Sequence, residues 1–177
     1  PDWPWLIKTF ADRSMCTDPK LLGGLTVSML DGRDGVLRKE FDKLIEWVRD
    51  EPRPDVVTIT NSMLIGVARP LAEALKAPVC CTLQGEALFL DGLVEPYRSQ
   101  ARDRIRCLVA DVDRFVAVSE FEARSMRDYL AIPAHRISVV PLGIRVRDFE
   151  SAESLDAERP FTIGFLGRIA PEKGLHV

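Results

Sequence analysis

The sequence is poor in the residues on which metal binding and acid–base chemistry most often depend. Its 177 residues include two histidines and four cysteines, and no two cysteines have the spacing Cys-x-x-Cys. This composition predicts that no metal is bound. Cys80 and Cys81 fall in an apolar run, where cysteine behaves as a small hydrophobic residue, so reduced thiols and a cytoplasmic protein are expected.

Other absences exclude several classes of protein. No apolar run approaches the roughly 18 residues that indicate a membrane-spanning helix. There is no internal repeat and no low-complexity tract, and the net charge of −3 gives no reason to expect nucleic acid as a partner. With 46% hydrophobic and 29% charged residues, the composition is that of a globular domain with a buried core.

What the sequence does contain is an alternation of strand-like and helix-like segments. Short, apolar and often β-branched runs predict strands at residues 26–30, 56–60, 79–83, 115–118 and 137–140. Amphipathic patterns between them predict helices at 36–49, 63–76, 97–110 and 119–130. Such alternation indicates parallel strands joined by right-handed crossovers. The predicted fold class is therefore α/β, a doubly wound, Rossmann-like parallel sheet with helices on both faces.

Three of these helices carry local signals. Asp34 is expected to cap the first helix, whereas Ser119 and Glu122 match the capping box at the start of the last one. Pro70 is expected to kink the second helix, with Gly66 one turn earlier easing the bend.

The carboxyl ends of the predicted strands are the expected place for a ligand, because ligands of open α/β sheets bind there. The segments at these ends are polar or contain glycine: Asp31-Gly32, Asn61-Ser62, Gln84-Gly85-Glu86, Ser119-Glu120 and Pro141-Leu142-Gly143. Several of these residues have two interpretations. Asn61 and Ser62 either bind a ligand or cap the next helix, Ser119 either caps or marks an anion site, and Gly143 either forms a tight turn or contacts a ligand.

Two cations follow the last strand-like segment. Residues 162–166 run into Gly167 and Arg168, and Lys173 follows five residues later with Gly174 at a predicted helix start. Glycines let the backbone approach a ligand, a helix start offers free N–H groups, and Arg and Lys neutralise charge, as a pyrophosphate site requires. The alternative is two surface cations beside a turn.

This segment also carries a resemblance to a known family. The run Gly167-Arg168-x-x-Pro171-Glu172-Lys173-Gly174 resembles the signature that opens the second domain of retaining glycosyltransferases of family four (glycosyl transferase group 1), which have the two-domain GT-B fold. Two earlier runs, which begin at Val116 and Arg136, resemble the end of the first domain of those enzymes. The resemblance covers residues 55–177, and its motifs occur in the family's order.

The resemblance implies a domain organisation and a reaction. Residues 1–144 would be the acceptor-side domain without its first strand, 145–160 a linker, and 161–177 the first strand and turn of a truncated donor-binding domain. The reaction would transfer a hexose from a nucleotide diphosphate sugar to an acceptor hydroxyl. This co-substrate is the only cofactor implied, and the isolated chain is expected to be inactive.

The resemblance also implies site residues. Gly167, Arg168 and Lys173 would bind the donor diphosphate. Gln84 stands where the family often has a histidine, which favours hydrogen bonding to sugar hydroxyls over a role for a titrating imidazole. Glu86 would be a base or a hydrogen-bond acceptor. Both are predicted catalytic residues, against the alternative of a polar turn after a strand.

The implied partners are a nucleotide-sugar donor and a carbohydrate or lipid-linked acceptor, and the parent protein could be peripheral to a membrane. Residues 162–166 have no later partner strand in the sequence, so a homodimer by strand exchange is a further expectation. Two rival functions stay open: a sugar-nucleotide epimerase of the same fold, and a non-catalytic binding or interaction module. The scarcity of histidine argues against the first.

Overall fold

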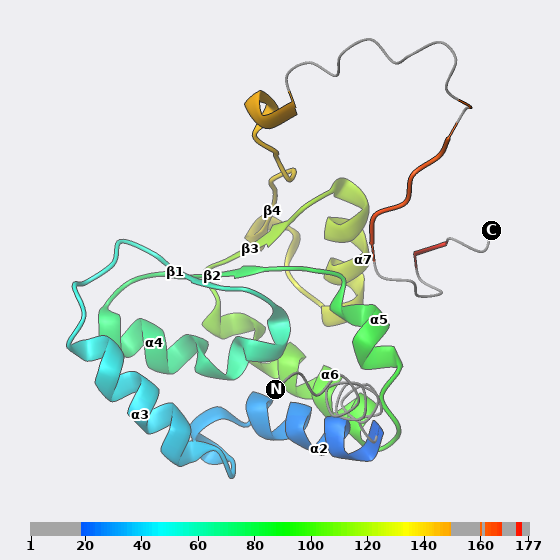
Figure 1. Cartoon of the computed structure of the whole chain (residues 1–177). Coiled ribbons are helices and arrows are strands. Elements are labelled where there is room, and N and C mark those ends of the chain that lie inside the picture. Colours follow the sequence, from blue (N-terminus) through cyan, green and yellow to red (C-terminus); the bar gives the residue numbers. More distant parts are fainter. Residues whose placement is uncertain (1–18, 150–159, 161, 168–172, 175–177) are drawn as a thin grey trace, which may run out of the picture. The chain divides into compact units, whose positions relative to one another are not determined.

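The structure of the protein, a computed structural model, describes residues 19–149, 160, 162–167 and 173–174. In this part of the chain, four parallel strands form one sheet in the order β1-β2-β3-β4 (Figure 1). The strands are β1 (Val57–Ile59), β2 (Val79–Thr82), β3 (Arg114–Ala117) and β4 (Ile137–Val139). The predicted α/β class with a Rossmann-like parallel sheet is confirmed, as are four of the five strands predicted before residue 145.

Helices alternate with the strands along the chain. They are α2 (Pro19–Leu30), α3 (Arg38–Arg49), α4 (Ala68–Leu75), α5 (Glu86–Asp91), α6 (Tyr97–Leu108) and α7 (Glu120–Leu130). Short 3-10 helices lie at Gly32–Asp34, Ser62–Val67, Val109–Asp111, Ala134–Arg136 and Val146–Phe149. The predictions for α6 and α7 are confirmed, and α3 is confirmed with a later start.

The register of the strands separates a buried face of the sheet from a partly exposed one. Cys81 pairs with Ile59 on one side and Phe115 on the other, and all three side chains are buried. One position earlier, Cys80 is only half-buried and pairs with the exposed Arg114. Consecutive parallel strands with right-handed crossovers place their connecting helices on one face. Helices on the opposite face, which a doubly wound sheet has, are not among the described residues.

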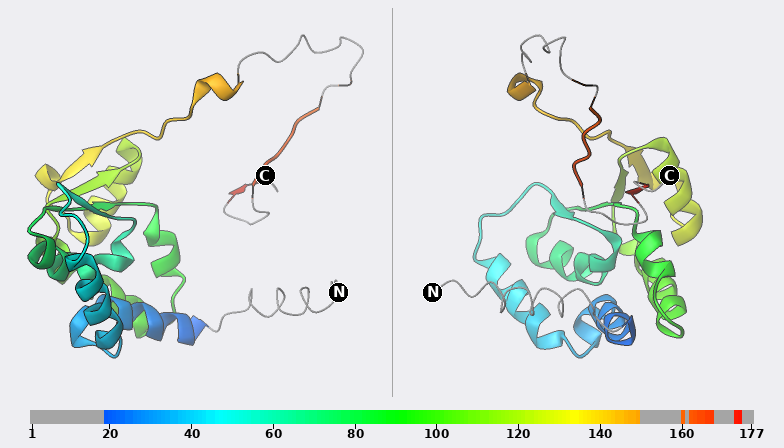
Figure 2. Two further views of the ribbon diagram at one scale, coloured as in Figure 1. Left: turned by 60° about the vertical axis from the view of Figure 1, so that its left-hand side comes forward. Right: turned by 45° about the vertical axis from the view of Figure 1, so that its right-hand side comes forward.

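The prediction of a strand at residues 26–30 is wrong, because this segment is the second half of α2. Its buried residues Thr26, Val27 and Leu30 follow helical spacing. The Thr26 hydroxyl donates to the carbonyl oxygen of Leu22 at 2.8 Å, so the helix satisfies this buried polar group. The helix packs against α6, and the two lie side by side in Figures 1 and 2.

Two predictions about helix ends are also wrong. Asp34 ends a 3-10 helix, and the residue before α3 is Leu37, which makes no side-chain cap. Pro70 does not kink a long helix, because α4 begins only at Ala68 and Pro70 lies in its first turn. Backbone N–H groups in the first turn of a helix have no intrahelical acceptor, so the missing N–H of proline costs no hydrogen bond there. Gly66 is required instead for close packing: a Cβ there would lie 2.6 Å from the carbonyl oxygen of Met29.

The chain divides into two compact units, Pro1–Leu142 and Gly143–Val177. The first contains the sheet. In the second, residues 162–167 form no strand, and the side chains of Ile163 and Leu166 are exposed. A strand needs a partner for its backbone groups, and none of the described residues supplies one. The assignment of an acceptor-side domain, a linker and the start of a donor-binding domain stays a prediction.

The helices of the described residues are too short and too polar to cross a membrane.

Candidate functional site

The loop after β2 lies at the carboxyl edge of the sheet, as predicted. Of the two residues predicted to be catalytic, Gln84 is in this loop and Glu86 is the first residue of α5, which follows it. Gln84 is exposed, and none of the described hydrogen bonds uses its side chain. Gly85 follows with a φ of 76°, a left-handed conformation that favours glycine. A Cβ at Gly85 would meet no atom within 4 Å, so open space adjoins the backbone here.

Glu86 faces the other way, into the protein, and is only 4% exposed. Its Oε1 accepts hydrogen bonds from the backbone N–H of Ser62 at 2.7 Å and from the Ser62 hydroxyl at 3.1 Å. Its Oε2 accepts from the backbone N–H of Gln84 at 2.8 Å. The carboxylate therefore joins the loop after β1 to the loop after β2, and its predicted role as a base stays a prediction.

The loop after β3 is tied to the same turn. Ser119 caps α7 as predicted, its hydroxyl oxygen accepting from the N–H of Glu122 at 3.2 Å. The side chain of Glu122 does not complete the capping box by returning to Ser119. Its Oε1 instead accepts from the backbone N–H of Gly85 at 2.8 Å. Three loops thus meet at one edge of the sheet.

The remaining residues predicted at this edge have different environments. Asn61 caps the 3-10 helix Ser62–Val67, with its Oδ1 accepting from the N–H of Met63 at 3.1 Å. Ser62 is fully buried, and its polar atoms bond to Glu86. Gly143 lies in the second unit and is exposed, and its backbone is neither in a turn nor at a positive φ. The Asn61 side chain therefore acts as a cap, and Ser62 acts as a hydrogen-bond donor to Glu86.

The predicted diphosphate site falls in the second unit. Gly167 and Lys173 are exposed, and Gly174 has a φ of 70°. Arg168 lies outside the described residues. The grouping of these residues around a diphosphate stays a prediction.

The thiol beside Glu86 is protected from ionising. Cys81 is fully buried, and burial is the main cause that raises its pKa, with smaller contributions from the charges of Glu86 and Cys80. A thiol with a raised pKa is a poor nucleophile, so Cys81 acts as a packing residue. No group of three or more metal-ligating side chains occurs in the part of the chain that the structure describes.

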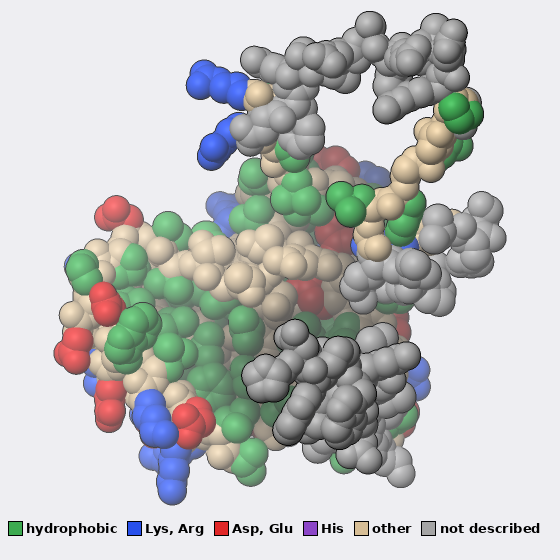
Figure 3. Space-filling view, viewed as in Figure 1, with side chains coloured by type: hydrophobic (Ala, Val, Ile, Leu, Met, Phe, Trp, Pro, Cys, Tyr) green, Lys and Arg blue, Asp and Glu red, His purple; other side chains and the backbone are tan. Residues whose placement is uncertain are grey.

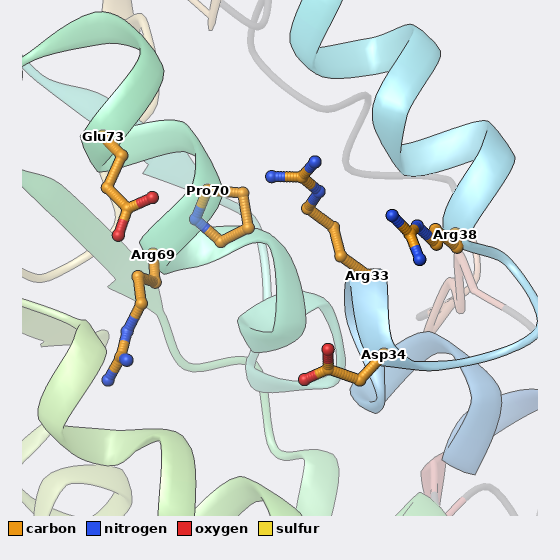
Figure 4. A pocket seen from close by; sticks show the side chains of 6 residues that line it. All are labelled: Arg33, Asp34, Arg38, Arg69, Pro70 and Glu73. Atoms are coloured by element: carbon orange, nitrogen blue, oxygen red, sulfur yellow. The ribbon is translucent and has the colours of Figure 1, made fainter.

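A surface hollow of about 300 Å³ lies between the starts of α3 and α4 (Figure 4). The residues that line it are Arg33, Asp34, Arg38, Arg69, Pro70 and Glu73. Arg33 donates to Asp42 at 2.7 Å, and Arg69 donates from its Nε to Asp111 at 3.1 Å. Side chains of both charge signs mix over α3 (Figure 3). None of the predicted site residues lines this hollow, and Arg33 and Arg69 in it are each paired with a carboxylate.

Comparison with protein families identifies the domain that carries this edge. Residues 19–143 match the family model described as the glycosyl transferase 4-like domain. The chain belongs to this family. The match extends from α2 past β4, so the loops that meet around Gly85 lie inside a GT-B glycosyltransferase domain, which implies binding of a sugar donor and an acceptor. None of the curated proteins compared with the chain matches it.

The sequence does not predict that Glu122 holds the turn at Gly85 on this edge of the glycosyltransferase domain. The capping-box pattern explained Glu122 through its neighbour Ser119, three residues away. Its hydrogen-bond partner Gly85 is 37 residues away, and only the packing of α7 beside the loop after β2 brings them together. The one signal in the sequence is that both residues follow a predicted strand and so belong to the same edge.

Proposed function

We propose that this chain is the acceptor-side part of a retaining glycosyltransferase that transfers a hexose from a nucleotide diphosphate sugar to a hydroxyl group of a carbohydrate or lipid-linked acceptor. The observation that carries the proposal is the family match over residues 19–143, which includes the edge where Gln84 is exposed. Retention, the hexose and the donor class rest on the motif at residues 167–174.

The proposed acceptor side is the turn after β2. The amide group of Gln84 can donate to one sugar hydroxyl and accept from another, which suits a ligand whose groups do both. Open space beside Gly85 lets a sugar approach the backbone. Asn61 and Ser119, at the ends of neighbouring strands, would border the acceptor from the positions in which they cap their helices.

The proposed donor side is the segment that contains Gly167, Arg168 and Lys173. As the bond between the anomeric carbon and the diphosphate breaks, the diphosphate oxygen takes the electron pair and the sugar gains oxocarbenium character. Arg168 and Lys173 would stabilise the charge that develops on the leaving group. The acceptor oxygen forms the new bond to the anomeric carbon and passes its proton to the departing diphosphate oxygen. Protein cations would then take the part that a metal ion has in other transferases.

The test is calorimetric titration with UDP and with GDP, in a protein that contains this chain together with a complete donor-binding domain. We expect one of the two nucleotides to bind, and Arg168→Ala and Lys173→Ala each to weaken binding at least tenfold, about 1.4 kcal/mol. Arg145→Ala is the matched control, because it removes an exposed cation of the same unit outside the motif. Binding that is indifferent to both motif substitutions would remove the donor assignment.

Pairing of residues 162–166 with another copy of the chain also stays a prediction. This segment forms no strand in the described part of the chain.

A further inference from the structure

The turn formed by Gln84 and Gly85 is held from two sides by carboxylates. The N–H of Gln84 donates to Glu86 Oε2 at 2.8 Å, and the next N–H along the chain, that of Gly85, donates to Glu122 Oε1 at 2.8 Å. Hydrogen bonds to ionised carboxylates are roughly twice as strong as those between neutral groups. Two consecutive peptide groups are thus fixed by charged acceptors that come from different helices, α5 and α7.

Each carboxylate is itself anchored. Glu86 is buried, and its Oε1 accepts from the backbone N–H and from the hydroxyl of Ser62. These two bonds fix the Glu86 side chain against the loop after β1. Glu122 is in the first turn of α7, where the Ser119 hydroxyl caps its N–H and where a negative charge is favoured by the helix dipole. The turn is therefore connected to the ends of β1 and β3 as well as to β2.

The backbone conformation completes the arrangement. With its φ of 76°, Gly85 turns the chain so that Glu86 points inward while Gln84 stays exposed. A site works best when the groups that meet the substrate are held by partners that do not meet it. The backbone N–H of Gln84 donates to Glu86, whereas none of the described hydrogen bonds involves its side chain. The backbone of Gln84 is thus fixed, and its side chain is available to a ligand.

We infer that Glu86 and Glu122 are positioning residues, which together hold the Gln84–Gly85 turn so that the Gln84 side chain faces the acceptor. This inference rests on the proposed function for the part played by Gln84. The two-sided hold on the turn is a property of the chain itself.

Amide hydrogen exchange of the 177-residue chain, followed residue by residue by NMR, tests the hold directly. In Glu122→Ala we expect the Gly85 amide to exchange at least tenfold faster, because its acceptor is gone. Glu122→Gln keeps a side-chain oxygen at the same place and should restore most of the protection. Glu120→Ala is the matched control: it removes a carboxylate from the same helix turn, and no described hydrogen bond uses that side chain.

The amides of Leu83 and Val140 serve as internal references, because they donate to the sheet carbonyl oxygens of Val116 and Ala117. A positioning role requires these two amides to exchange as in the wild type. Equal acceleration at Leu83 and Gly85 would mean that Glu122 only stabilises the fold and would overturn the inference. So would an unchanged Gly85 amide in Glu122→Ala, or the same effect in Glu120→Ala. Failure of UDP and GDP to bind would overturn the proposed function and leave this result as it stands.

Discussion

A buried carboxylate such as Glu86 is tolerated only where donors surround it, and here three donors do so. In Glu86→Gln one oxygen becomes an NH₂ group, which faces an N–H donor and leaves at least one buried donor without an acceptor. We expect the free energy of unfolding to fall by about 1–3 kcal/mol. Urea denaturation measures this change.

Glu120→Gln is the control for that substitution, because Glu120 is exposed and should change stability by less than about 0.5 kcal/mol. A loss of stability in Glu86→Gln no larger than in this control would show that the hydrogen bonds of Glu86 contribute nothing to the fold. The loop after β1 would then be held by its own contacts.

At the level of single residues, the sequence predicts what depends on near neighbours and misses what depends on tertiary packing. The cap formed by Ser119 is a contact over three residues and is predicted correctly. The bonds of Glu86 to Ser62 and of Glu122 to Gly85 span 24 and 37 residues. No local pattern encodes such partners, so the hydrogen bonds that Glu86 accepts from Ser62 could not be predicted from the sequence.

Among the helices, the backbones of α2 and the 3-10 helix Ser62–Val67 are so close at Gly66 that no side chain fits at this position. A Cβ on Gly66 would lie 2.6 Å from the carbonyl oxygen of Met29 and 2.7 Å from that of Leu30. Both are backbone atoms, which cannot rotate away. We expect Gly66→Ala to destabilise the chain by about 1–3 kcal/mol through overpacking, measured as a lower midpoint of urea unfolding.

Gly24→Ala is the matched comparison, because the nearest atom to its Cβ would be 4.0 Å away, on the ring of Tyr97. Gly24 lies inside α2, where alanine is a better helix former by roughly 0.5–1 kcal/mol, so this variant should be stabilised. Equal effects of the two substitutions would contradict the close approach at Gly66.

Two elements differ from the sequence prediction, each for its own reason. Residues 26–30 are apolar and include a Thr-Val pair, so within a five-residue window they look like a buried strand. The helical spacing of α2 becomes visible only when Leu22 is included. The amphipathic pattern of residues 63–76 runs through the 3-10 helix Ser62–Val67 and α4, so it predicts one long helix with Pro70 in its middle. In contrast, β1 to β4 are short, β-branched and bounded by turns, and all four are predicted.

For the whole molecule, strand–helix alternation is sufficient to predict a parallel sheet but not the order of its strands. The order β1-β2-β3-β4 is a property of the contacts between strands, and it places the described crossovers on one face. The edge that carries Gln84 is predictable, because the carboxyl ends of parallel strands lie together whatever their order.

The first unit contains its own core. The buried hydrophobic residues of the described part of the chain all lie between Val27 and Ile132, and none comes from the second unit. A domain that buries its apolar surface without a neighbouring unit should fold without it. We therefore expect a chain that ends at residue 142 to unfold cooperatively, with a Tm within about 4 °C of that of the 177-residue chain, roughly the shift that corresponds to 1 kcal/mol in a domain of this size.

Calorimetric scans of the two chains measure this difference, and a chain shortened into β4 provides the control. A chain that ends at residue 138 loses Val140, whose N–H donates to the carbonyl oxygen of Ala117, and it interrupts β4. This shorter chain should unfold at a clearly lower temperature. If the chain that ends at residue 142 is destabilised as much as the shorter one, the first unit does not fold independently, and the prediction is wrong.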